Sequence, residues 1–107
     1  MNRDESLRRA VATLPCACCG IEGYTQVAHS NLSEHGKGRG LKAGDWYIMP
    51  LCCTRVGVPG CHVELDQLIG MTAEEAEELT KKWIINTYVE LWLRGLINVD
   101  IRKIPKP

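Results

Sequence analysis

The sequence predicts a small α+β domain stabilised by zinc, and three observations favour this class. The chain has 107 residues, 45% of them hydrophobic, which is enough for one core and too little for two ordinary domains. Segments typical of helices flank two short segments typical of strands. Phenylalanine is absent, so the core must rest on aliphatic residues and on the tryptophans Trp46, Trp83 and Trp92. A metal ion would strengthen so thin a core.

The first half of the chain is expected to form one helix and two strands. Residues 4–14 are predicted to be helical up to Pro15, with three apolar side chains on one face: Leu7, Val11 and Leu14. Residues 24–29 and 46–51 are rich in β-formers and predict two strands. The glycine-rich segment 30–44 between them is expected to be a mobile, positively charged loop.

The second half is expected to be helical. A short helix is predicted over 61–69, and a long one over about 72–94, opened by the capping-box spacing of Thr72 and Glu75. The end of the long helix is apolar on more than one face, so we expect the core or a second subunit to bury part of it, and a homodimer through this helix is one expectation. Residues 98–107 are predicted to be an extended tail.

Six cysteines in a small protein can indicate either disulfides or a metal site. The charged segment Met1–Arg9 carries no apolar signal sequence, and no apolar run approaches the roughly 20 residues that span a bilayer. We therefore expect a cytoplasmic protein with no membrane partner. In a reducing compartment, paired cysteines bind metal or do redox chemistry more often than they form permanent crosslinks.

The cysteine spacing favours a structural zinc site. Cys16 and Cys19 have the Cys-x2-Cys spacing that presents two thiolates to one ion, and Cys52 and Cys61 are the expected second pair. Two alternatives stay open within this set, because Cys53 could replace Cys52 and because a further thiol lies close by, at Cys18. The competing interpretations are buried core thiols and a redox pair.

A histidine and a carboxylate form a second group beside the cysteines. His62 directly follows Cys61, and Asp66 lies one helical turn later on the same face. Such a pair can hold a divalent cation such as Mg²⁺, Mn²⁺ or Zn²⁺, and Asp66 could instead form a salt bridge. His29, read from the residues alone, could be a zinc ligand or a structural histidine.

The charge balance alone does not indicate a nucleic-acid partner, because thirteen basic and thirteen acidic residues cancel. Basic residues nevertheless gather in the glycine-rich segment, at Lys37, Arg39 and Lys42. They could contact phosphates, or they could belong to a solvated connector.

Several motifs in order along the chain resemble one family. They are Cys16-x2-Cys19, Ala28-His29, the glycine and lysine segment up to Asp45, Pro50-Leu51-Cys52 and Cys61-His62-x3-Asp66. As a set they resemble the HNH, or ββα-metal, endonucleases, and most closely the small nucleases of lambdoid prophages and phages. The resemblance covers residues 16–66, and it implies a ββα-metal core over about 15–70 with an added helix at each end.

The resemblance also implies roles for individual residues. His29 would be the general base, His62 and Asp66 would hold the catalytic divalent metal, and Asp45 would orient His29 or act as a further ligand. Lys37, Arg39 and Lys42 would contact the phosphates of nucleic acid, with DNA as the expected substrate. This chain departs from the family at Ala28, where many members carry a metal ligand, and it lacks the middle asparagine.

Two other functions compete with the nuclease. A zinc-stabilised DNA-binding module without catalysis would keep the cysteines but would not need His29 and His62 to act on one substrate. A thiol redox protein would require Cys16 and Cys19 to be mobile and reactive, and tightly bound zinc would exclude it.

Overall fold

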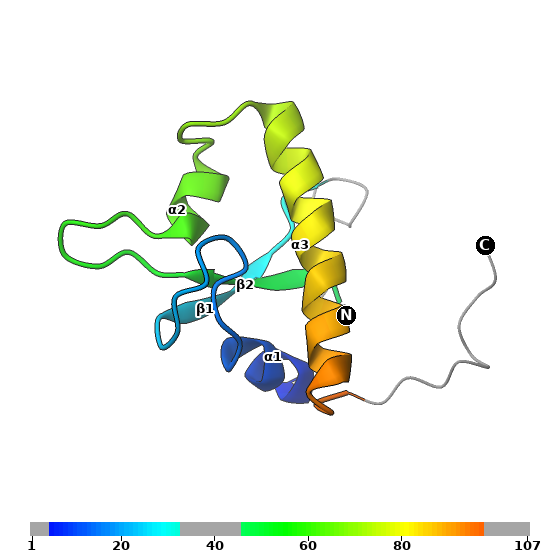
Figure 1. The fold of residues 1–107 in the computed structure, drawn as a ribbon. Helices are drawn as coiled ribbons and strands as arrows, with labels where there is room; N and C mark the ends of the chain where they lie inside the picture. Colours follow the sequence, from blue (N-terminus) through cyan, green and yellow to red (C-terminus); the bar gives the residue numbers. More distant parts are fainter. Residues whose placement is uncertain (1–4, 33–45, 98–107) are drawn as a thin grey trace.

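The described part of the chain folds into a small mixed α+β domain (Figure 1). The computed structural model describes residues 5–32 and 46–97. In chain order its elements are α1 (Glu5–Ala12), β1 (Thr25–His29), β2 (Ile48–Cys52), α2 (Cys61–Asp66) and α3 (Ala73–Leu93). The predicted α+β class is therefore confirmed. The predicted tail 98–107 and most of the predicted loop 30–44 lie outside the described residues.

The two strands form an antiparallel pair that carries the rest of the domain. Thr25 pairs with Cys52 at one end and His29 with Ile48 at the other. Every residue of β2 is buried. This burial follows from the surroundings of the strand, because α1, α2 and α3 all pack against β2. The structure places both strands one or two residues from the predicted ranges.

The sheet separates two hydrophobic clusters. One, toward α2 and the first half of α3, includes Ala28, Met49, Leu51, Leu65, Trp83 and Ile84 together with three of the cysteines. The other lies between α1 and the end of α3 and consists of Leu7, Val11, Leu14, Ile48 and Leu91. Figure 1 shows α1 beside the C-terminal end of α3, which agrees with this second cluster. The three residues predicted to form the apolar face of the first helix thus share one cluster.

The prediction that three tryptophans contribute to the core is wrong for two of them. Trp83 is 6% exposed and packs in the first cluster, whereas Trp46 and Trp92 are each 56% exposed. Aliphatic residues and cysteines fill the space instead. The core is therefore even poorer in aromatic side chains than the composition implies.

Helix α3 begins and ends as the sequence predicts. The Thr72 side chain accepts a hydrogen bond from the Glu75 N–H, and the Glu75 side chain accepts one from the Thr72 N–H, which together form a capping box. At the other end Gly95 has φ 70, and the N–H groups of Gly95 and Leu96 donate to Trp92 and Leu91. This is a Schellman ending, in which glycine takes the left-handed conformation at the lowest cost.

The second half of α3 carries apolar side chains on its solvent side as well as its core side. The exposed residues recur at helical spacing and are Ile85, Val89, Trp92, Leu93 and, just after the helix, Leu96. The homodimer through this helix stays a prediction. No helix in the described ranges combines the length and the apolar character needed to cross a membrane.

The capping box gives the first testable prediction. Thr72→Ala removes the oxygen that accepts the Glu75 N–H, so the free energy of unfolding should fall by about 1 kcal/mol. Thr72→Ser keeps that oxygen and should stay within a few tenths of a kcal/mol of the original. Urea denaturation followed by circular dichroism measures both, and equal losses in the two variants would contradict the role of the cap.

Candidate metal centre

Four cysteine side chains from three separate segments converge on one point. The segments are the turn after α1, the end of β2 and the start of α2, and they supply Cys16 and Cys19, Cys52, and Cys61 respectively. The four Sγ atoms lie within 4.8 Å of one another, with 3.9 Å between Cys19 and Cys52. Tetrahedral zinc with bonds of about 2.3 Å places its sulfur ligands about 3.8 Å apart. The group could therefore hold a structural metal ion such as zinc.

The turn that carries the first pair is closed by its own backbone. The Cys19 N–H points at the Cys16 sulfur at 3.5 Å, and the Gly20 N–H donates to the Cys16 carbonyl at 2.9 Å. Gly20 has φ 78, which suits glycine. The Ala17 N–H donates to the Pro50 carbonyl at 2.8 Å and so attaches the turn to β2.

The second pair is brought together by a hairpin over residues 53–60. Arg55 and Val58 form a bridge with two hydrogen bonds of 2.9 Å, and Figure 1 shows this hairpin projecting away from α3. At its base the Cys61 N–H donates to the Cys52 sulfur at 3.3 Å. The residues between Cys52 and Cys61 therefore form a hairpin that leaves the cluster and returns to it, so the two sulfurs still lie close together.

Gly60 allows the two ends of the hairpin to touch. A Cβ atom at this position would lie 2.4 Å from the carbonyl carbon of Cys53 and 2.5 Å from the carbonyl oxygen of Cys52. The Gly60 N–H also donates to the Thr54 hydroxyl at 3.1 Å. Its φ of −72 is available to any residue, so close backbone approach alone accounts for the glycine.

The structure distinguishes among the candidate thiols. Cys53 follows Cys52 in an extended segment and is absent from the cluster, and its N–H donates to the Tyr24 carbonyl at 2.8 Å. Cys18 is exposed and also lies outside the cluster. The geometry thus favours the predicted set over the two alternatives.

The surroundings of the cysteine thiols shift their pKa values in different directions. Burial opposes ionisation of Cys52, but the Cys61 N–H and the Arg55 side chain outweigh it and lower the pKa to about 6. Burial, followed by contacts with other thiols, raises the pKa of Cys61. The Ile21 backbone lowers the pKa of Cys19, yet burial and the Cys16 contact leave it raised. At pH 7 Cys52 is therefore a thiolate, whereas Cys19 and Cys61 carry protons.

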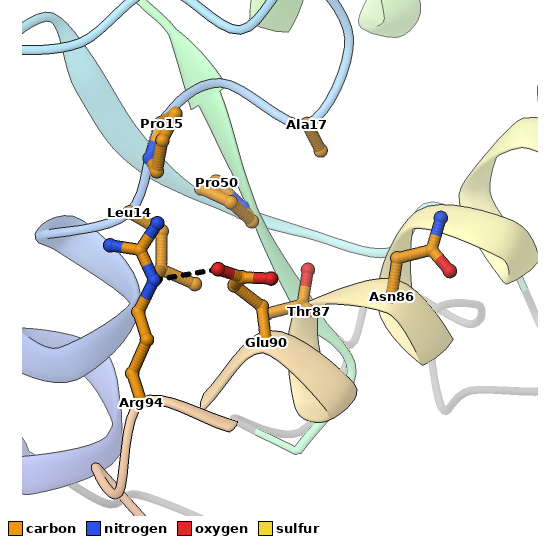
Figure 2. Close-up of a pocket in the computed structure, with 8 residues that line it drawn as sticks. All are labelled: Leu14, Pro15, Ala17, Pro50, Asn86, Thr87, Glu90 and Arg94. Carbon is orange, nitrogen blue, oxygen red and sulfur yellow. Dashed lines mark hydrogen bonds and ion pairs between the residues drawn. The ribbon is translucent and has the colours of Figure 1, made fainter. Parts of the chain in front are cut away.

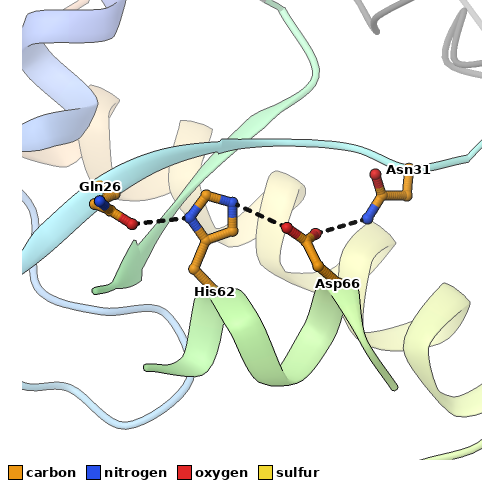
Figure 3. A network of polar contacts seen from close by, with 4 residues as sticks. All are labelled: Gln26, Asn31, His62 and Asp66. Atoms are coloured by element: carbon orange, nitrogen blue, oxygen red, sulfur yellow. Dashed lines mark hydrogen bonds and ion pairs between the residues drawn. The ribbon is translucent and has the colours of Figure 1, made fainter. Parts of the chain in front are cut away.

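A polar network next to the cysteines holds His62 and Asp66 (Figure 3). His62 Nδ1 lies 3.1 Å from Gln26 Oε1, and its Nε2 lies 3.5 Å from Asp66 Oδ2. The Asn31 amide donates to Asp66 Oδ1 at 2.8 Å. A histidine that donates from Nδ1 to Gln26 keeps the Nε2 lone pair free to bind a cation.

The spacing of this pair suits one shared ion. Two ligand atoms that each lie about 2.1 Å from a cation are about 3.0 to 3.4 Å apart, close to the observed 3.5 Å between Nε2 and Oδ2. Within the described ranges, however, the four cysteines are the one group of three or more metal-ligating side chains. The pair could thus supply two ligands, and the remaining positions would need water, substrate or residues outside these ranges.

The other predicted site residues either point away from the His62–Asp66 pair or lie outside the described ranges. His29 is partly buried at the last position of β1. Because side chains alternate along a strand, His29 shares the side of Val27, opposite to that of Gln26 and Ala28. Gln26 contacts His62, so the alternation directs His29 away from that pair. The remaining predicted residues, Lys37, Arg39, Lys42 and Asp45, lie outside the described residues.

Two pockets flank these groups. One of about 280 Å³ lies between the cysteine turn and α3, with apolar walls and the Arg94–Glu90 ion pair of 2.7 Å at its rim (Figure 2). It contains none of the predicted site residues. The other, of about 350 Å³, lies between α2 and α3 and includes Asn31 and Asp66 in its lining. Asp66 and its partner Asn31 therefore border this second pocket.

Three positions of the site were not found from the sequence. Gln26 and Asn31 hold the His62–Asp66 pair, and Gly60 closes the hairpin. Strand alternation could have placed Gln26 on the side of Ala28, but nothing in the sequence indicates which helix faces that side. Asn31 reaches Asp66 beside a turn in which the Ser30 hydroxyl accepts the Leu32 N–H, and this type of turn has only a weak sequence signal.

The protonation states give a second prediction. Binding of zinc at pH 7 should release at least two protons, one from Cys19 and one from Cys61, so zinc affinity should fall as the pH falls. Calorimetric titration in two buffers of different ionisation enthalpy counts the protons. Cys53→Ser should leave the count unchanged, whereas a zinc-binding heat that is the same in both buffers would contradict the prediction.

The glycine contact gives a third prediction. Gly60→Ala should lower the free energy of unfolding of the zinc-loaded protein by about 2 kcal/mol or more, because backbone must move to admit the methyl group. Gly57→Asn is the matched control at the hairpin tip, where φ is 75, a conformation that asparagine tolerates, and where there is open space. A Gly60→Ala protein as stable as the control would show that the approach is not tight.

The described residues thus combine a four-cysteine centre with a His–Asp pair, and the histidine of this pair, His62, directly follows Cys61. Comparisons of the chain with protein-family models, with curated proteins and with solved structures found no match.

Proposed function

We propose that this protein is a metal-dependent endonuclease that hydrolyses phosphodiester bonds of nucleic acid, with DNA as the first substrate to test. One observation carries the proposal, namely the facing Nε2 and Oδ2 atoms of His62 and Asp66, held by Gln26 and Asn31 beside the cysteine centre. Paired ligands that are oriented by further hydrogen bonds are typical of metal sites. The proposed family is that of the HNH nucleases.

The order of elements supports a ββα-metal core. Strands β1 and β2 pair antiparallel, and α2 follows β2 and packs against it. Cys61 begins α2 and belongs to the cysteine centre, so a bound structural metal would fix the start of the helix that carries His62 and Asp66. Helices α1 and α3 would then be additions to this core.

The proposed chemistry divides among the residues. A divalent cation held by His62 and Asp66 would offset the charge of the scissile phosphate and of the leaving oxygen. Gln26 and Asn31 keep the two ligands in their rotamers. His29 would accept a proton from the attacking water, and Asp45 would assist it. Lys37, Arg39 and Lys42 would bind flanking phosphates without reading the bases, so weak sequence preference is expected.

A second candidate is a zinc-stabilised nucleic-acid-binding module without catalysis. The position of His29 favours it, because strand alternation directs this side chain away from the side on which Gln26 meets His62. Ala28, which does lie on that side, is 1% exposed and has no ligand atom. In this alternative the cysteines would serve the fold alone.

Cleavage assays separate the two candidates and give a fourth prediction. With zinc-loaded protein, plasmid and short duplex or single-stranded DNA should be cut when Mg²⁺ or Mn²⁺ is added. His62→Ala and Asp66→Asn should each reduce the rate about a hundredfold or more, and His29→Ala by a similar factor, because the first two remove a proposed metal ligand and the third the proposed base. Gln67→Ala is the matched control, since Gln67 is exposed directly after α2.

The outcomes are distinct. Cleavage that persists in His62→Ala and Asp66→Asn would contradict the metal site. If cleavage persists in His29→Ala but is lost in His62→Ala and Asp66→Asn, His29 is not the general base, whereas the proposed metal site stands. Salt-sensitive DNA binding with no cleavage under any cation would favour the binding module.

A further inference from the structure

The Arg55 side chain contacts the cysteine centre from the hairpin. Its Nη1 donates at 3.1 Å to the carbonyl of Cys53, the residue next to Cys52, and the Arg55 side chain lowers the pKa of Cys52. The guanidinium carbon lies 4.7 Å from the centre of the Tyr24 ring, in the geometry of a cation–π contact. The backbone of Arg55 is fixed by its bridge to Val58. Both ends of the side chain are therefore held in place.

The charge of the cysteine centre explains what a cation at this position does. Four thiolates around one Zn²⁺ carry a net charge of about −2, because two of the four negative charges remain uncompensated. Three of the four cysteines are buried, so water screens this charge poorly. A guanidinium can donate to sulfur and to a carbonyl at once, because its five N–H groups form a rigid fork.

We propose that Arg55 is a positioning residue of the metal centre, which holds the backbone next to Cys52 and offsets the negative charge of the tetrathiolate site, so that it tightens zinc binding. This proposal does not depend on the nuclease, because it concerns retention of the structural ion. Loss of DNA cleavage would leave it intact.

Zinc affinity tests the proposal directly. Full-length Arg55→Gln should bind zinc about tenfold more weakly than the original protein, measured by competition with a chromogenic chelator. Arg55→Lys keeps the charge but lacks the fork, and should recover part of the loss, to about threefold weaker binding. Arg94→Gln is the matched control, since Arg94 pairs with Glu90 at the rim of the pocket between the cysteine turn and α3.

Tyr24→Leu tests whether Arg55 affects zinc affinity through its charge or through its packing on the Tyr24 ring. It removes the ring beneath Arg55 and leaves the hydrogen bond to the Cys53 carbonyl, so zinc affinity should stay within about threefold of the original. Salt gives a second measure: the difference between the original protein and Arg55→Gln should shrink as ionic strength rises, because salt screens a charge interaction. A loss caused by packing would not change with salt.

Three results would overturn the proposal. The first is an Arg55→Gln protein whose zinc affinity lies within about twofold of the original and of Arg94→Gln. The second is equal loss in Arg55→Gln, Arg55→Lys and Tyr24→Leu with no effect of salt, which would assign Arg55 to packing. The third is an Arg55→Gln protein that does not fold in excess zinc, which would assign the side chain to the fold.

Discussion

Convergence of four cysteine sulfurs on one point is the constraint on which the rest of this small domain depends. The sulfurs come from a turn, a strand end and a helix start, so a bound ion would fix three segments that a short chain could otherwise join only through its core. That core is modest: it contains one buried tryptophan, and three of its buried side chains are themselves cysteines of the centre. Packing and metal coordination therefore share the same residues, and we expect loss of the metal to loosen the sheet and α2 together.

The cysteine centre also determines where the polar groups stand. Cys61 opens α2, and the next residue, His62, begins the network that runs through Asp66 to Asn31. The two groups have different surroundings. Backbone N–H groups and Arg55 stabilise negative charge on the cysteines, whereas the His–Asp pair is more exposed and borders a pocket. The cysteine group could therefore hold a structural metal ion, whereas the His–Asp pair is partly open to solvent.

Features that depend on residue spacing and on helix-end signals could be predicted from the sequence, whereas features that depend on tertiary contacts could not. The α+β class, the capping box at Thr72 and the glycine end of α3 follow from local rules, and the structure has all three. The choice of Cys52, the last residue of β2, over Cys53 does not, because only the completed sheet shows which side of the strand the other cysteines occupy. The absence of phenylalanine leads us to expect Trp46 and Trp92 in the core, yet nothing in a sequence states which face of a helix or turn the core covers. Gln26 and Arg55 owe their roles to neighbours far along the chain, or across the hairpin, that no local pattern specifies.

The hairpin between the second pair of cysteines separates a fixed base from a free tip. Gly60 closes the base against backbone, whereas Val56 at the tip is fully exposed. Additional residues at the tip would lengthen a loop whose ends are already joined, and the entropic cost of such lengthening grows slowly. The tip is accordingly the place to insert a fluorescent label, whose signal would report assembly of the neighbouring centre without altering any of its ligands.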